Sequence, residues 1–161
     1  MLINTSIKYC LLSLLLAFQF ASCSDNIKSS IPDYPVSLDL NLTSTYPIFK
    51  NSVNDFLLFK TIVGLPVTSR IGFGGIIVCT SGFDDSGNSL YFAFDMACPF
   101  EVKNNIRVYP DTTGLSRVVC EKCGSVFDVS YGNGSPISGP AKETLKRYRT
   151  NFVGDVLYIT R

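Results

Sequence analysis

The two-residue period of apolar positions from about residue 36 onwards is the feature that most constrains what this chain can fold into. The stretch VSLDLNL at 36–42 alternates apolar and polar residues, which predicts a strand with one buried face. FLLFKTIV at 56–63 and GGIIVCT at 74–80 are short, nearly continuous apolar runs rich in β-branched and aromatic residues, as expected of buried strands. Only 141–148 suggests a single helical turn, so we predict an all-β fold.

Two hairpins are predicted by turn residues between neighbouring apolar runs. LYFAFD at 90–95 should pair with the run that ends at residue 80, across a Gly- and Asp-rich loop. Near the C-terminus, Gly154-Asp155 separates the runs at 147–153 and 156–160, and such a pair suits a two-residue hairpin turn. The ordered series of strands and turns predicts one antiparallel β-sandwich domain over residues 36–161.

Residues 1–22 have the order of a secretory signal peptide rather than of a folded element. A lone Lys8 precedes an apolar run from Cys10 to Phe20, and small residues follow that run. The run is too short to span a bilayer permanently. We therefore expect the segment to direct export and to be removed.

The segment ends in Ala21-Ser22-Cys23, which resembles the bacterial lipobox, although Phe20 stands where leucine is usual. In a lipobox the cysteine becomes the lipidated first residue of the mature protein. We therefore expect Cys23 to anchor the protein in a membrane of the cell envelope, the bacterial outer membrane. Residues 23–35 are polar, Ser-rich and contain two prolines, which predicts a flexible tether between the lipid and the domain.

Composition excludes several classes of partner and reaction. Fourteen Lys and Arg against thirteen Asp and Glu leave no basic stripe for phosphates, so we expect no nucleic-acid partner. The GFGG stretch at 72–75 lacks the GxGxxG spacing and a following helix pattern, so we expect no nucleotide. The chain has no histidine, which removes Ser-His-Asp and Cys-His catalysis, and we expect no enzyme activity.

Four cysteines lie beyond the lipobox. Cys79 follows an apolar run inside a predicted strand and is expected to be a small buried hydrophobe. Cys98, in ACPFE, and the pair Cys120 and Cys123, in VVCEKCGS, follow strands directly, where the chain leaves the sheet and loops can converge. Two cysteine loops at strand ends are a stronger signal for a shared site than a single Cys-x-x-Cys.

From about Gly74 to Ile159 the chain resembles the Rieske iron–sulfur domain in the order of its strands and loops. In that family a Cys-x-His loop and a Cys-x-x-His loop hold a [2Fe-2S] cluster. By position, Cys98 and Cys120 match the two cysteine ligands, whereas Phe100 and Cys123 stand where the histidines should be. Further matches are Ser125, which corresponds to a serine that often hydrogen-bonds cluster sulfide, and the loop that covers the cluster, with Gly134, Pro136, Gly139, Pro140 and Ala141.

The resemblance implies a Rieske-type sandwich with two cysteine loops at one end and a degenerate cluster site. Phe100 cannot donate electrons to iron, and we expect its ring to fill the space of metal or imidazole. An ordinary Rieske centre is therefore excluded, and we expect no cofactor. In the family the matching thiolates hold the same iron, which implies a disulfide between Cys98 and Cys120. A bridge from Cys98 to Cys123, or within the pair Cys120 and Cys123, stays open.

Three functions are consistent with these residues. The first is a cluster-free binding or structural module of the cell envelope with an unknown protein partner. The second is an electron carrier in which Cys98, Cys120 and Cys123 hold a [2Fe-2S] cluster or a single metal, with Glu101 or Cys79 as a further ligand. The third is a thiol redox module in which Cys120 and Cys123 cycle between dithiol and disulfide, although no helix pattern follows that would activate a thiolate.

Overall fold

The structure is a computed structural model that describes residues 29–85 and 87–161. Its elements are β1 (Val36–Asn41), α2 (Pro47–Lys50), β2 (Phe56–Phe59), β3 (Arg70–Ile71), β4 (Ile76–Phe83), β5 (Ser89–Asp95), β6 (Val108–Pro110), β7 (Arg117–Cys120), β8 (Val126–Asp128), β9 (Ser135–Ser138), β10 (Arg147–Val153) and β11 (Val156–Thr160). The predicted all-β, antiparallel fold is confirmed. The helical turn expected at 141–148 is wrong, because residues 141–146 are irregular and β10 begins at Arg147.

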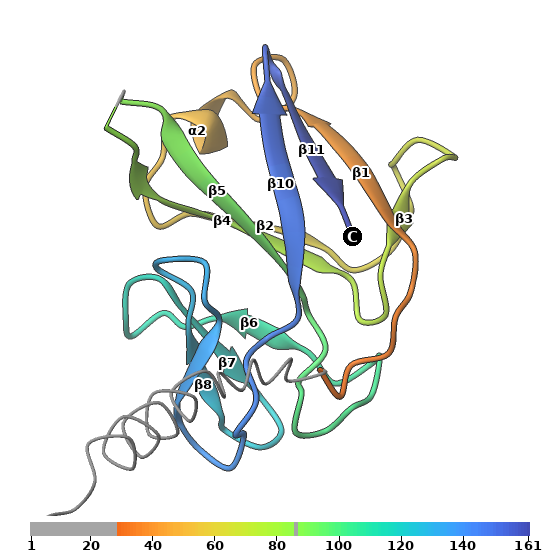
Figure 1. The fold of residues 1–161 in the computed structure, drawn as a ribbon, viewed down its shortest axis with the longest axis vertical. Helices are drawn as coiled ribbons and strands as arrows, with labels where there is room; N and C mark the ends of the chain where they lie inside the picture. The colour runs from red at the N-terminus through yellow and green to blue at the C-terminus, as the bar shows by residue number, and fades with distance from the viewer. Residues whose placement is uncertain (1–28, 86) are drawn as a thin grey trace, which may run out of the picture.

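Seven strands form a large, strongly curled sheet in the order β2-β4-β5-β10-β11-β1-β3 (Figure 1). Both predicted hairpins are present, as β4–β5 and as β10–β11, which turns at Gly154 with φ +62°. The long strand β10 joins the two halves of the sheet, because its first residues pair with β5 and the rest pairs with β11. The curl encloses a first hydrophobic core.

The alternation of VSLDLNL fits this core directly. Within β1, Val36, Leu38 and Leu40 are buried while the residues between them are exposed. Burial of an aliphatic side chain of this size contributes about 1.5–3 kcal/mol. The first core contains Val36, Leu38, Leu40, Leu42, Phe49, Phe59, Ile76, Val78, Tyr91, Ala93, Tyr148, Leu157 and Ile159.

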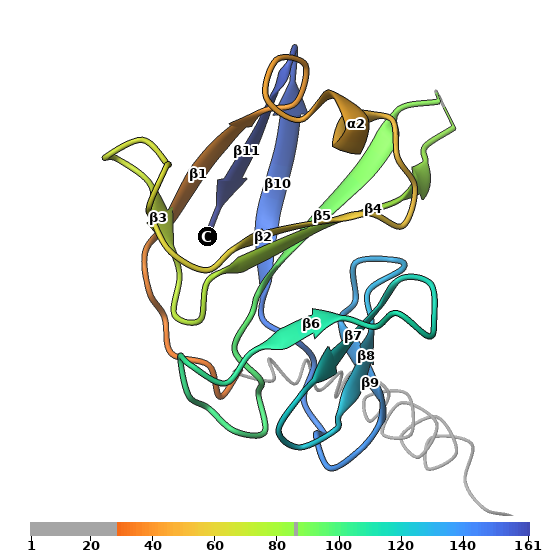
Figure 2. The ribbon, with the colours of Figure 1, turned by 180° about the vertical axis from the view of Figure 1, so that it is seen from behind.

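A smaller sheet, in the order β6-β7-β8-β9, packs below the large one over a second hydrophobic core (Figure 2). Along β4, Ile76 and Val78 belong to the first core, whereas Ile77 and Cys79 belong to the second. This double burial explains why the sequence of β4 is continuously apolar and does not alternate. Cys98 and Cys120 also lie in the second core, so the two cysteine loops meet where the sheets pack together.

A buried carboxylate at the end of β5 fixes the start of the first cysteine loop. Asp95 accepts hydrogen bonds from the backbone N–H groups of Phe73, Gly74 and Ala97, and from the Tyr148 hydroxyl at 2.6 Å. Gly74 leaves no room for a side chain, because a Cβ there would lie 2.4 Å from the Ala97 nitrogen. The GFGG stretch is therefore a turn packed against the backbone that leads to Cys98.

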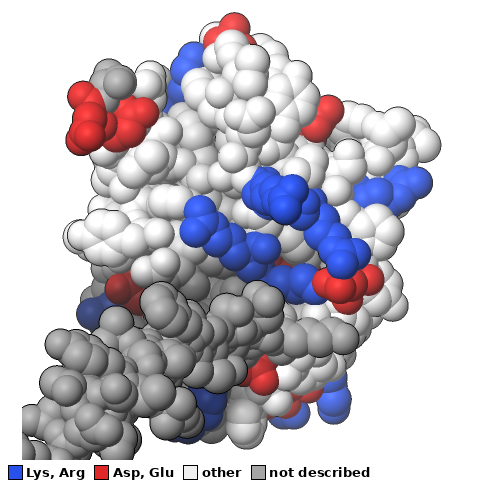
Figure 3. Space-filling view, in the orientation of Figure 1, with Lys and Arg blue, Asp and Glu red and all other residues white. Residues whose placement is uncertain are grey.

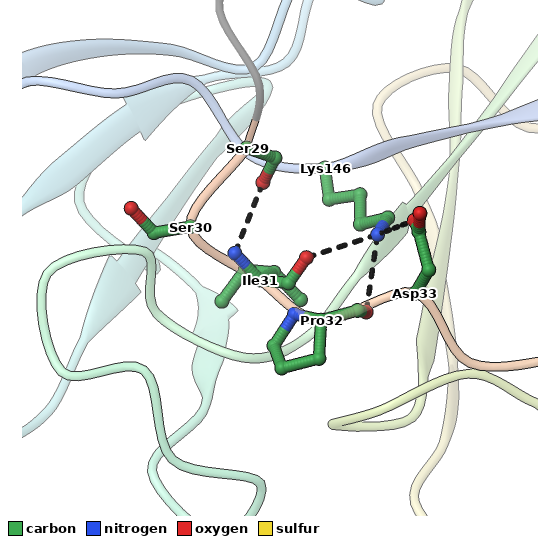
Figure 4. A pocket seen from close by; sticks show the side chains of 6 residues that line it. All are labelled: Ser29, Ser30, Ile31, Pro32, Asp33 and Lys146. Carbon is green, nitrogen blue, oxygen red and sulfur yellow. Dashed lines mark hydrogen bonds and ion pairs between the residues drawn. The ribbon is translucent and has the colours of Figure 1, made fainter.

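Residues 29–35 are docked on the domain and are not a free tether, which corrects the expectation for this part of 23–35. Ile31 is 2% exposed, and Lys146 Nζ donates to the carbonyl oxygens of Ile31 and Pro32, at 3.0 Å each, and to the Asp33 carboxylate (Figure 4). Ser30 donates to the Glu143 carboxylate. The composition of the segment is otherwise polar, so the sequence did not indicate that Ile31 is buried against the domain.

The predicted signal peptide at 1–22 and the lipidation site Cys23 lie outside the described residues. Within the part of the chain that the structure describes, none of the helices has the length and apolar character needed to cross a membrane.

Positive charge is in local excess on one face, although positive and negative side chains are nearly balanced over the whole chain. Figure 3 shows Lys and Arg side chains gathered on the face that carries β10 and β11 in Figure 1. Arg147 and Arg149 are both exposed and lie two positions apart on β10, so they share one face of that strand. Lys146 and Arg161 pair with Asp33, so part of this positive charge is neutralised at the docked segment.

Candidate metal site

The two cysteine loops share the same closing hydrogen bond and end in a left-handed residue. In loop 1, Cys98–Val102, the N–H of Val102 donates to the Cys98 carbonyl at 2.9 Å. In loop 2, Cys120–Gly124, the N–H of Gly124 donates to the Cys120 carbonyl, also at 2.9 Å. Both closing residues are left-handed, with φ +50° at Val102 and +70° at Gly124. Glycine adopts this conformation freely, whereas a β-branched residue does so at a cost of about 1–2 kcal/mol.

The two loops bring three thiols together. The Sγ atoms of Cys98, Cys120 and Cys123 all lie within 4.8 Å of one another, and the Cys98 to Cys123 distance is 3.7 Å. Thiolates bound tetrahedrally to one Zn²⁺ at about 2.3 Å would lie about 3.8 Å apart. Cys98 and Cys120 are buried and Cys123 is half-buried. The expected convergence of the two cysteine loops is therefore confirmed.

The surroundings shift the pKa values of Cys98 and Cys123 in opposite directions. Burial raises the pKa of Cys98 to about 12, although the backbone N–H groups of Glu101 and Phe100 act against it. Burial also acts to raise the pKa of Cys123, but hydrogen bonds from the Ser125 hydroxyl and N–H, and from the other two thiols, outweigh it and hold this pKa below its usual value. The Cys123 thiol therefore ionises more readily than the Cys98 thiol.

Ser125 and the loop after β9 support Cys123. The Cys123 Sγ lies 3.2 Å from Ser125 Oγ, which accepts a hydrogen bond from the Ala141 N–H at 3.0 Å. This arrangement leaves the hydroxyl proton of Ser125 available to a thiolate. Gly139 packs on the same residue, because a Cβ at Gly139 would lie 2.5 Å from the Ser125 Cα.

The other residues matched to the covering loop lie elsewhere. Gly134 packs in the second core, where an added Cβ would meet Leu145 and Phe94. Pro136 is paired with Phe127 within the small sheet, and Pro140 is exposed.

Phe100 does not fill the site, which corrects the expectation from the sequence. Its side chain is 53% exposed. Phe100 is the third residue of its turn, and the equivalent residue of loop 2, Lys122, is also exposed. The direction of the side chain follows from the turn, which sends this position outward whatever its polarity. The Cys-x-x-Cys spacing of loop 2 was the signal that could have indicated this direction.

Cys79 takes no part in the group. It is 2% exposed in β4, its Sγ lies 4.0 Å from the carbonyl oxygen of Val129, and burial raises its pKa to about 12. The prediction of a small buried hydrophobe is confirmed. All four described cysteines are free thiols, so the implied Cys98–Cys120 disulfide is not formed in this structure and stays a prediction for the oxidised protein.

An ion pair that the sequence did not indicate joins the two loops. Lys122 Nζ lies 2.8 Å from Glu101 Oε2, and the Glu101 side chain is only 11% exposed. The hydrogen bond and charge of Glu101 raise the pKa of Lys122, and negative charge on Cys120 or Cys123 would act in the same direction. The ammonium group of Lys122 is therefore held at the edge of the cluster of three thiols.

Neither the protein-family models nor the curated protein sequences contain a significant match to this chain. The described residues do not supply the two-cysteine, two-histidine ligand set of an ordinary Rieske [2Fe-2S] cluster. Phe100 offers no donor atom and points outward, and the three thiols surround a single point.

Proposed function

We propose that this domain binds one thiophilic metal ion, Zn²⁺ or a divalent ion of similar preference, on Cys98, Cys120 and Cys123. The observation that carries the proposal is the mutual approach of three thiols from two loops to within 4.8 Å. Soft thiolates select such ions over Mg²⁺ or Ca²⁺, and tetrahedral geometry fits Zn²⁺. The ion would link loop 1 to loop 2 where the two sheets pack together.

The resemblance to the Rieske domain supports this proposal, because the two loops that hold the cluster in that family would here hold a single metal ion. Three thiols around one point favour a single ion over a cluster. The cluster-free module was inferred from the missing histidine ligands and from a Phe100 ring expected inside the site, and the exposure of that ring removes the second of these two arguments. We therefore place the metal-binding module ahead of the cluster-free module and of the [2Fe-2S] electron carrier.

A thiol redox role is the second candidate. It is favoured by the 3.7 Å distance between the Cys98 and Cys123 sulfurs and by the lowered pKa of Cys123. An oxidant such as diamide would take two electrons and two protons from this pair to give a disulfide. Mass spectrometry of non-reduced peptides would separate this bridge from Cys98–Cys120.

The proposed location is the cell envelope, with Cys23 lipidated and the domain held at a membrane surface. Because residues 29–35 are docked, only residues 24–28 would separate the domain from the lipid, a reach of about 20 Å when fully extended. Such a short link would favour a partner that lies in or on the same membrane.

The metal content of the full-length protein, purified without oxygen, tests the proposal. We expect about one equivalent of a thiophilic ion after incubation with Zn²⁺, and no labile sulfide. Stoichiometric iron with labile sulfide would instead support the electron carrier. Failure to retain Zn²⁺ in the reduced protein would support the cluster-free module.

A further inference from the structure

Loop 1 has a residue other than cysteine at the position that corresponds to the second cysteine of loop 2. Loop 2 is Cys120-x-x-Cys123 closed by Gly124, and loop 1 is Cys98-x-x-Glu101 closed by Val102. The closing hydrogen bonds are 2.9 Å in both loops, and both closing residues have a left-handed φ. Glu101 therefore occupies in loop 1 the position that Cys123 occupies in loop 2.

The surroundings of Glu101 agree with this placement. Its side chain is almost buried although it carries a charge, and its backbone N–H donates to the Cys98 sulfur. The carboxylate is held by Lys122, which is the neighbour of Cys123 in loop 2. The Glu101 side chain thus lies between the two loops, at the edge of the cluster of three thiols.

On the basis of the proposed metal site, we propose that Glu101 supplies the fourth ligand and completes a Cys₃Glu site. Aspartate and glutamate oxygens bind Zn²⁺ at about 2.0–2.2 Å, alongside thiolates at about 2.3 Å. Among the described residues, the ligand atoms within 4.8 Å of one another are the three thiols alone, so the carboxylate would have to turn from Lys122 towards the metal.

Lys122 has a defined role in this exchange. Three thiolates and one carboxylate around a divalent ion carry a net charge of −2, which needs a nearby cation. When Glu101 turns to the metal, the ammonium group of Lys122 loses one salt bridge and remains beside Cys120 and Cys123. The existing ion pair therefore keeps the fourth ligand close to its site before the metal arrives. Cys79, the other candidate ligand considered from the sequence, is bonded elsewhere in the core.

The test compares full-length wild type with Glu101→Gln and with Glu121→Gln as a matched control. Glu121 is an exposed acid in loop 2, and its replacement by glutamine changes the local charge by the same amount. Zn²⁺ affinity is measured by competition with a chromophoric chelator, and geometry by the visible d–d absorption of bound Co²⁺. We expect Glu101→Gln to lower Zn²⁺ affinity about 10- to 100-fold and to change the Co²⁺ spectrum, with the control within about 3-fold of wild type.

A gain-of-ligand variant, Glu101→Cys, keeps the proposal testable if the glutamine variant folds poorly. If the loops are equivalent, the new thiol completes a four-thiolate site, and the sulfur-to-cobalt charge-transfer band should grow by about one third. Wild-type affinity and spectrum in Glu101→Gln, or an unchanged band in Glu101→Cys, would overturn the assignment of Glu101 while leaving the three-thiol site standing. Absence of Co²⁺ and Zn²⁺ binding in wild type and in both variants would overturn the metal site itself.

Discussion

The Sγ atoms of Cys98 and Cys123 lie 3.7 Å apart, although 25 positions separate the two residues in the chain. This approach depends on elements that fix each loop from outside. Asp95 holds the backbone that enters loop 1, and the second hydrophobic core packs Cys98 against Cys120. Loop 2 is fixed by the contact of Ser125 with the backbone around Gly139. The three thiols are therefore held close together by the fold before any ion binds.

Single serine substitutions of the three grouped cysteines should each lower Zn²⁺ affinity strongly. A hydroxyl is a poorer ligand than a thiolate for a soft ion, so we expect losses of about 100-fold or more in Cys98→Ser, Cys120→Ser and Cys123→Ser. Cys79→Ala is the matched control, because Cys79 is equally buried but lies outside the group. Chelator competition measures the effect, and equal losses in Cys79→Ala would contradict the site.

Cys79 should also make the metal-free protein less stable at alkaline pH. The pKa of this thiol is about 12 in the folded protein, against 9.0 for an unperturbed cysteine, so the unfolded chain releases the proton first. This contribution is fully present below pH 9 and is lost as pH rises towards 12, at up to about 1.4 kcal/mol per pH unit. Urea unfolding of reduced wild type and Cys79→Ala from pH 8 to 10.5 should show a shallower slope in the variant. Parallel slopes would contradict the burial of this thiol.

The buried carboxylate of Asp95 should matter more for stability than any exposed ion pair. In Asp95→Asn, the amide N–H₂ would face either the N–H groups of Gly74 and Ala97 or the N–H of Phe73 and the Tyr148 hydroxyl, depending on its orientation. Either orientation sets donor against donor, and we expect a loss of about 3 kcal/mol or more. Tyr148→Phe removes one donor only and should cost about 1–2 kcal/mol. Chemical denaturation checks the order, and an asparagine variant within about 1 kcal/mol of wild type would refute the role of this carboxylate.

The two hairpins were predicted from turn residues, and the meeting of the cysteine loops from their positions at strand ends. The pattern of apolar residues predicted β1, β2, β4, β5, β10 and β11 but not the short strands β3, β6, β8 and β9. It could not predict that Ile31 docks, because one apolar residue in a polar segment has no period. The partners of Asp95 are backbone N–H groups from distant turns, which no side-chain pattern encodes. The left-handed conformation of Val102, which closes loop 1, was also not predictable, because β-branched residues rarely adopt it.

The docked segment predicts a specific effect of Lys146. In Lys146→Met, the carbonyl oxygens of Ile31 and Pro32 lose their donor while the aliphatic stem is retained. We expect faster proteolysis between residues 24 and 34 and little change in the resistance of the sheets. Lys142→Met, at an exposed position nearby in the chain, is the control. Identical digestion of the two variants would show that Lys146 does not hold the segment.

X-ray absorption at the zinc edge of the Zn²⁺-loaded full-length protein is the decisive measurement for the proposed metal site, because it counts and identifies the atoms bound to the metal. We expect three sulfur neighbours at about 2.3 Å and one oxygen neighbour at about 2.0–2.2 Å, with no second metal nearby. A first shell of oxygen and nitrogen with one sulfur or none would contradict a metal site built from Cys98, Cys120 and Cys123.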